Sequence, residues 1–148
     1  MSDSPDVVIS PSKAAARIRA AAVDAFASAG YGGTTTRDIA ARLDMSPAAM
    51  YPHYRSKEEL LFAISYEGHT EALKVVEGAD RPGEEPSVRL QELISTFASW
   101  QAGHHSLARV VQYELTALTP EHYRTVVALR RSTTRVVREV VDAGVQSG

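Results

Sequence analysis

The feature that most constrains this sequence is a run of closely spaced helix-start signals between Thr34 and Lys57. Thr35, Ser46 and Ser56 are residue types that cap a helix N-terminus by accepting a backbone hydrogen bond. An acidic residue follows both Thr35 and Ser56 at the third position, as in a capping box. Pro47 follows Ser46 at the first helical position, where its missing N–H costs nothing. The run therefore predicts two short helices and the entry to a third.

Two short helices joined by a tight turn form a helix-turn-helix. We expect the first helix over residues 36–43, a turn at Asp44 and Met45, and the second helix from residue 47 to about 54. Pro52 lies inside the second helix, where it removes one backbone bond and crowds the carbonyl four residues earlier. We therefore expect this helix to tighten or stop at Pro52, so that only its first turn can meet DNA bases.

The distribution of charge supports a DNA-binding head. The whole chain has a formal net charge of −2. Residues 12–57 nevertheless carry seven basic and three acidic side chains, which leaves a net charge of −6 on the remainder. A basic head on an acidic body is the asymmetry expected of a nucleic-acid-binding module, although solvated charges can also cluster by chance.

Residues 17–61 resemble the N-terminal domain of TetR-type repressors. The resemblance is carried by Gly-Tyr at 30–31, Thr-Thr at 34–35, Asp-Ile-Ala at 38–40 and MYPHYRSKEELL at 50–61, which occur in the family's order and spacing. Asp44 stands in the turn where such repressors usually have glycine. Aspartate tolerates a left-handed conformation better than most residues, so we expect the turn to form.

The resemblance implies contacts with double-stranded DNA. The positions that match phosphate-touching residues of the family are Thr36, Arg37, Tyr51, His53 and Lys57. Helix N-termini, hydroxyls and cations suit phosphate, which agrees with this assignment. Pro47 and Ala48 match base-reading positions and would read DNA by apolar contact, for instance with a thymine methyl group. Met50 and Tyr54 are expected in the core.

The remaining sequence predicts an all-α fold. Apolar residues recur at helical spacing in five further segments: residues 12–29, 57–76, 87–102, 106–118 and 120–143. A breaker-rich loop covers residues 78–86, and a turn lies at Gly103 and the two histidines after it. We therefore expect a three-helix DNA-binding domain at residues 12–57, joined by a long helix to a helical regulatory and dimerisation body at residues 58–148.

A candidate ligand site lies in the body. On a helix over residues 106–118, Glu114 would point into the middle of an apolar face, where a carboxylate must be paired or protonated. It could anchor a ligand, or it could pair with a body arginine such as Arg130 or Arg131 or with a tyrosine hydroxyl. Four aromatic residues could line such a pocket or simply form core: Phe97, Trp100, Tyr113 and Tyr123. We expect no metal at His104 and His105, which would point apart on a helix, and no cofactor.

Other classes of protein find little support. The chain shows no Gly-rich phosphate loop, nucleophile elbow or paired-carboxylate motif, so we expect no enzyme activity. Cysteine is absent, no apolar run of membrane-spanning length occurs and the N-terminus lacks a signal peptide, which favours a cytoplasmic protein away from membranes.

The resemblance implies a transcriptional repressor that binds a palindromic operator as a homodimer and is released by a small molecule, lipid-like or acyl-CoA-like. The alternative is a ligand-independent DNA-binding or interaction module without an inducer pocket. TetR-type bodies usually close with two further helices that supply most of the dimer interface. The sequence ends before such a segment, either because those helices lie outside this chain or because it is a short member, and the dimer contact stays open.

Overall fold

The computed structural model describes residues 12–148, and this part of the chain contains α-helices, one 3₁₀ turn and no strand. The elements are α1 (Lys13–Ala29), α2 (Thr36–Arg42), α3 (Pro47–Met50), α4 (Lys57–Ala79), α5 (Pro86–Gly103), α6 (His105–Tyr113), η1 (Leu115–Ala117) and α7 (Pro120–Ser147). The predicted all-α class is confirmed. None of these helices is both long and apolar enough to span a membrane.

The predicted N-caps fix where the short helices begin. The side chains of Thr35, Ser46 and Ser56 each accept a hydrogen bond from the backbone N–H three residues on. At Thr35 the capping box is complete, because the Asp38 carboxylate accepts from the Thr35 N–H at 2.8 Å. The second box differs from its prediction: Glu59 accepts from the Arg55 N–H at 3.0 Å.

The turn of the helix-turn-helix forms as expected, and the second helix is shorter than the predicted residues 47–54. Asp44 adopts a left-handed conformation with φ 52°, which lets the chain reverse between α2 and α3. The α3 helix is a single turn that ends at Met50, two residues before Pro52. Proline thus limits the second helix, as its missing donor and its steric bulk require.

The predicted helix over residues 106–118 is wrong at its C-terminal end. The α6 helix ends at Tyr113, and Glu114 is its C-cap instead of a residue on its apolar face. A 3₁₀ turn follows and brings Leu115 and Leu118 into the core, at 5% and 7% exposure. Pro120 also disfavours helix at the residue before it, so Thr119 is extended and caps α7.

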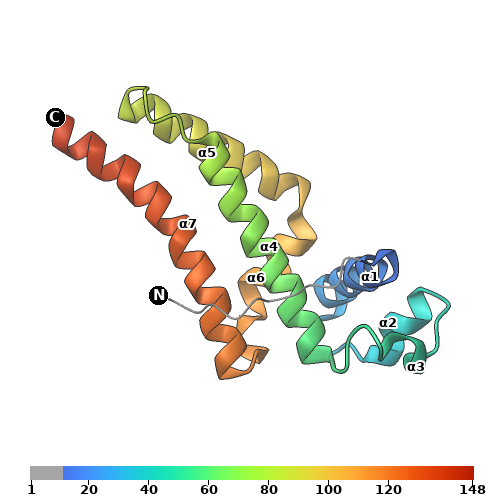
Figure 1. Cartoon of the computed structure of the whole chain (residues 1–148). Coiled ribbons are helices and arrows are strands. Elements are labelled where there is room, and N and C mark those ends of the chain that lie inside the picture. The colour runs from blue at the N-terminus through green and yellow to red at the C-terminus, as the bar shows by residue number, and fades with distance from the viewer. Residues whose placement is uncertain (1–11) are drawn as a thin grey trace.

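Figure 1 shows α4 running through the centre of the molecule, with α5 and α7 on either side of its C-terminal part. Helices α1, α2 and α3 gather at the other end of α4 and form the head. The head also packs against α6, which contacts both α1 and α4. One helix, α4, therefore belongs to both the head and the body.

Two separate apolar cores stabilise this arrangement. The first fills the head and continues into the lower body through Val110, Leu115, Leu118 and Val126. The second lies at the far end of the body around Val76, Leu93 and Val140. Because the first core spans the junction, the head packs directly on α6 and does not depend on α4 alone for its position.

Candidate functional site

The surface of the helix-turn-helix presents the residues expected to read DNA. Pro47, Ala48 and Tyr51 are exposed on and just after α3, and the Tyr51 side chain is 62% accessible. Met50 points the other way and is buried, as is Tyr54, so the prediction that both are core residues is confirmed. This single helical turn therefore has one face in the core and one exposed face that can contact a groove of DNA.

The residues expected to bind phosphate lie around this surface and differ in their exposure and in the contacts that they make. Thr36 and Arg37 occupy the first turn of α2, where the N–H groups are positioned for an anion. His53 is half-buried. Lys57 is also half-buried, because its ammonium donates to the Tyr31 carbonyl at 2.8 Å and lies 4.1 Å from the centre of the Tyr31 ring. Lys57 thus fixes the start of α4 to the turn after α1, a role that its sequence position did not reveal.

Tyr31 is also one of the points where the body contacts the head. The Glu114 carboxylate accepts a hydrogen bond from the Tyr31 N–H at 3.3 Å. Burial, together with the charges of Glu58 and Glu114, raises the pKa of the Tyr31 hydroxyl. The expected arginine partner of Glu114 is not found: Arg130 donates instead to the Gln112 side-chain oxygen at 2.9 Å.

A second polar contact joins the start of α4 to the start of α7. The Glu58 carboxylate accepts from the Thr119 N–H at 2.9 Å and lies 2.8 Å from His122 Nδ1. The His122 ring stacks on Phe62 with a centroid separation of 3.7 Å. Two side chains near the N-terminus of α4 therefore connect the head end of this helix to the body.

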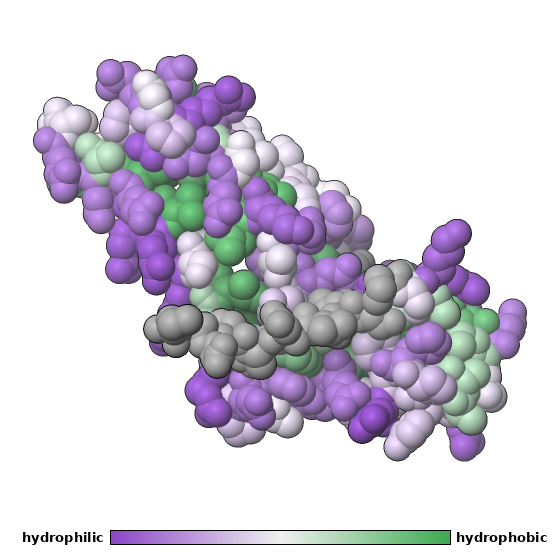
Figure 2. Space-filling view, in the orientation of Figure 1, coloured by the Kyte–Doolittle hydropathy of each residue, from purple (hydrophilic) through white to green (hydrophobic). Residues whose placement is uncertain are grey.

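A cavity of about 370 Å³ opens between the two cores, with walls from α4, α5, α6 and α7. Its lining residues are Gly68, His69, Ala72, Phe97, Trp100, Gln101, Leu107, Ala108, Val111, Gln112, Arg130, Thr133, Thr134 and Val137. Figure 2 shows hydrophobic surface in the body between hydrophilic side chains. The size falls within the range of about 300–1,000 Å³ that is usual for small-molecule sites.

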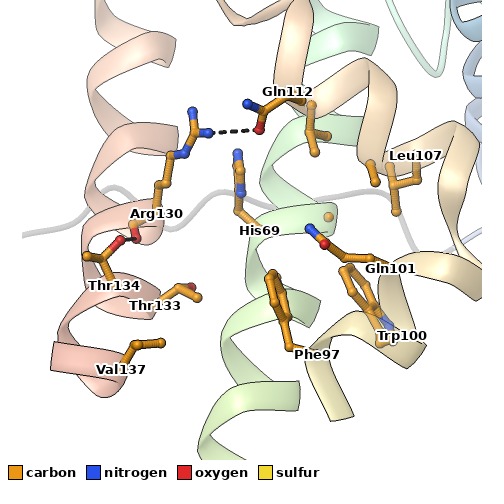
Figure 3. Close-up of a pocket in the computed structure, with 14 residues that line it drawn as sticks. His69, Phe97, Trp100, Gln101, Leu107, Gln112, Arg130, Thr133, Thr134 and Val137 are labelled. Carbon is orange, nitrogen blue, oxygen red and sulfur yellow. Dashed lines mark hydrogen bonds between the residues drawn. The ribbon is translucent and has the colours of Figure 1, made fainter. Parts of the chain in front are cut away.

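The cavity has an apolar part and a polar end. Phe97, Trp100 and Val137 belong to the apolar part, whereas His69, Gln112 and Arg130 gather at the polar end (Figure 3). Among the described residues that line the cavity none is acidic, and Arg130 carries the one permanent charge. The lining thus suits a mostly apolar ligand with a hydrogen-bonding or anionic group at one end.

His69 is the most unusual residue of this lining. Its side chain is 8% exposed, and its Nε2 atom has no hydrogen-bond partner. Burial, with a smaller contribution from the Arg130 charge, lowers the pKa of His69 from 6.5 to about 4. The imidazole is therefore neutral at pH 7, with one N–H donor and one acceptor nitrogen.

The sequence identified only part of this cavity. Phe97 and Trp100 line it, but Tyr113, Glu114 and Tyr123 do not. Tyr113 and Tyr123 are 74% and 42% exposed, and Glu114 lies at the head junction because α6 ends before it. His69, Gln112 and Arg130 were missed as a group. A signal existed for His69, which lies four residues after Ser65 and three before Ala72, on the buried stripe of α4.

Both parts of the chain match described protein families. Residues 18–64 match the family described as "Bacterial regulatory proteins, tetR family". Residues 83–148 match the one described as "Tetracyclin repressor-like, C-terminal domain". The first match covers the helix-turn-helix and the start of α4, and the second covers most of the body.

Individual relatives agree with these matches. A bacterial regulatory protein in the tetR family from Rhodococcus RHA1 is 52% identical, with a TM-score of 0.90 over 93% of this chain and 72% of its own. The structure of AibR in complex with isovaleryl coenzyme A and operator DNA is 26% identical, with a TM-score of 0.79 over 89% of this chain and 74% of its own. The fatty acid metabolism regulator protein of Bacillus subtilis (strain 168) is 25% identical over 128 residues. This chain spans 66% of the length of that last relative.

Proposed function

The chain belongs to the TetR family of bacterial regulatory proteins, and from this premise we propose that it is a repressor which an apolar small molecule releases from its operator. It acts as a DNA-binding regulator and not as an enzyme. One observation carries the proposal for the ligand: the cavity between the two cores has α4 as one wall, and α4 also begins at the head.

The head is proposed to bind double-stranded DNA through α2 and α3. Pro47 and Ala48 enter the major groove, and Thr36, Arg37, Tyr51, His53 and Lys57 contact the backbone on either side. A single exposed helical turn reads few bases, so useful specificity needs two heads on a palindromic site, supplied by a homodimer. The proposed place of action is the cytoplasm, where bacterial DNA lies.

The ligand is proposed to be lipid-like or acyl-CoA-like. The apolar wall of the cavity supports this class. So do the names of two relatives, a fatty acid metabolism regulator and a protein crystallised with isovaleryl coenzyme A. A ligand-independent module is disfavoured because the cavity contains a buried polar atom without a partner, which a bound molecule would satisfy.

The proposed release mechanism is a shift of α4 relative to the head core. Gly68, His69 and Ala72 of α4 line the cavity, and Lys57 at its first turn bonds to Tyr31 of the head. A ligand that favours one tilt of α4 and α6 changes the spacing of two heads in a dimer. By thermodynamic linkage, the bound ligand weakens operator binding by a certain free energy, and bound DNA weakens ligand binding by the same amount.

Selection of bound duplexes from a random DNA pool tests the DNA-binding part. We expect enrichment of a sequence with two-fold symmetry and, by light scattering, an even number of protein chains per duplex. Enrichment of no sequence, or one chain per duplex at saturation, contradicts the proposal. Repeating the selection with acyl compounds present tests release, and an unchanged yield of bound DNA with every compound would leave the ligand-independent alternative.

A further inference from the structure

We propose that His69 binds the acyl oxygen of the effector through its Nε2 atom, with Arg130 beside this oxygen and the acyl chain directed toward Phe97 and Trp100. This inference rests on the proposed function, because it assigns a role inside the same cavity. It adds the chemical group that is recognised, the residue that recognises it and the size of the ligand.

The first support is the unpaired Nε2 atom. His69 as a residue is more than nine-tenths buried, yet its Nε2 atom has no hydrogen-bond partner, and buried polar atoms in native proteins are nearly always hydrogen-bonded. His69 lines the cavity and points to the end where Gln112 and Arg130 meet (Figure 3). Nε2 is covered by protein atoms, so a ligand oxygen at this end would satisfy it once neighbouring side chains such as Arg130 and Gln112 move aside.

The second support is the charge state of the polar end. A neutral imidazole carries a single N–H, which can face the ligand when Nε2 is the protonated nitrogen. Arg130 supplies the one fixed positive charge among the described lining residues, and none of these residues is acidic. These groups favour an oxygen with partial or full negative charge, as in a carboxylate or thioester carbonyl, over an amine or a hydrocarbon.

The third support is size. At about 370 Å³ the cavity lies near the lower end of the usual range for small-molecule sites. The aromatic side chains of Phe97 and Trp100 stack at 6.2 Å between ring centroids and form one boundary of the apolar part. A short or branched acyl chain fits this space, whereas a long chain would have to leave it.

Trp100 provides a direct measurement, because it is the single tryptophan of the sequence and it lines the cavity. Its fluorescence can follow the binding of three probes that share a six-carbon chain: hexanoate, the hexanoyl thioester of N-acetylcysteamine, and 1-chlorohexane, which has no oxygen. The informative variants are His69→Leu, which removes the donor, and His69→Gln, whose amide nitrogen can replace Nε2. His105→Leu is the matched control, because His105 is exposed and does not line the cavity.

We expect His69→Leu to reduce the affinity for the two acyl probes about tenfold, because one hydrogen bond is lost. The affinity for 1-chlorohexane should change less than about twofold, because the apolar contact is kept. His69→Gln should recover most of the acyl affinity, and His105→Leu should match the unmodified protein. All variants should bind the selected operator duplex normally without probe, which checks that they fold. An equal loss for all three probes, or no recovery with His69→Gln, overturns the role of His69.

The same measurement separates this inference from the proposed function. If the acyl probes bind and release operator DNA but His69→Leu changes nothing, the inference fails and the proposed function stands. If no acyl probe binds or releases DNA, both fail. The source of the oxygen follows from which probe releases operator DNA at the lower concentration: hexanoate indicates a free carboxylate, and the thioester indicates a thioester carbonyl. Arg130→Gln should weaken the binding of hexanoate more than that of the thioester, because only the carboxylate carries a full negative charge.

Discussion

The carboxylate of Glu114 accepts a hydrogen bond from the backbone N–H of Tyr31, so the end of α6 in the body is tied to the turn after α1 in the head. The Tyr31 carbonyl accepts a second bond from Lys57 at the start of α4. One peptide segment of the head is therefore held from two body elements, α6 and α4. In the proposed release mechanism, a displacement of either helix would therefore be transmitted to the head through Tyr31.

Glu114→Ala should reduce the free energy of unfolding by about 1–2 kcal/mol, because the Tyr31 N–H loses a charged acceptor. Glu114→Gln should lose less, since an amide oxygen can still accept. Denaturant unfolding measures both variants. Glu92→Ala, an exposed change on α5, is the control and should stay near the unmodified value. Equal stability of Glu114→Ala and the control would show that the Tyr31 contact contributes nothing.

Tyr51→Phe and Lys57→Ala should both weaken DNA binding to a similar extent on all sequences, because both residues are proposed to contact phosphates. Lys57→Ala should also reduce the slope of log affinity against log salt by about one unit. Binding titrations at several salt concentrations measure this slope. If Lys57→Ala loses stability but keeps the same salt slope, Lys57 does not contact phosphate and serves only to bond Tyr31.

The head could be predicted from sequence because its determinants are local. Thr35, Ser46 and Ser56 cap helices through side chains that reach only three residues along the chain, and Pro52 stops α3 by sterics. The body depends on contacts distant in sequence. On an uninterrupted helix Glu114 would lie on an apolar face, but Leu115 and Leu118 are buried in the first core and α6 ends before Glu114.

Prediction of the cavity from the sequence is limited in the same way. Phe97 and Trp100 could be named because aromatic residues are conspicuous, but their neighbours at the polar end come from three different helices. His69, Gln112 and Arg130 lie far apart in the sequence, and only the packing of α4, α6 and α7 brings them together. Whether His69 Nε2 has a hydrogen-bond partner likewise depends on the side chains around it, and a local sequence pattern cannot predict these.

The buried His69 should make stability depend on pH in a defined window. Its pKa is about 4 in the folded chain and ordinarily 6.5, so between these values the unfolded chain binds more protons. The stabilisation is complete above pH 6.5 and is lost as the pH falls toward 4, by up to about 3 kcal/mol. In His69→Leu the free energy of unfolding should fall less between pH 6.5 and 4, by this amount, as measured by denaturant unfolding at several pH values. Parallel profiles would mean that His69 titrates normally.

Gly68 sets how closely α6 approaches α4. A Cβ atom at this position would lie 3.3 Å from both Leu107 Cδ1 and Val111 Cγ1. Gly68→Leu should therefore force the helices apart and cost about 1–3 kcal/mol of stability, as overpacking does. Gly78→Leu on the same helix is the matched control, because nothing lies within 4 Å of its added Cβ. Thermal unfolding compares the two, and an equal effect would show that the α4–α6 crossing tolerates extra volume.

The most direct test of ligand-controlled DNA binding is a reciprocal titration. The affinity for the selected operator duplex is measured by fluorescence anisotropy without and with a saturating acyl probe, and the affinity for the probe by Trp100 fluorescence without and with the duplex. A ligand-released repressor predicts that both affinities fall by the same factor, about 5- to 150-fold for a typical coupling. An operator affinity that stays constant while Trp100 reports a filled cavity would contradict the account.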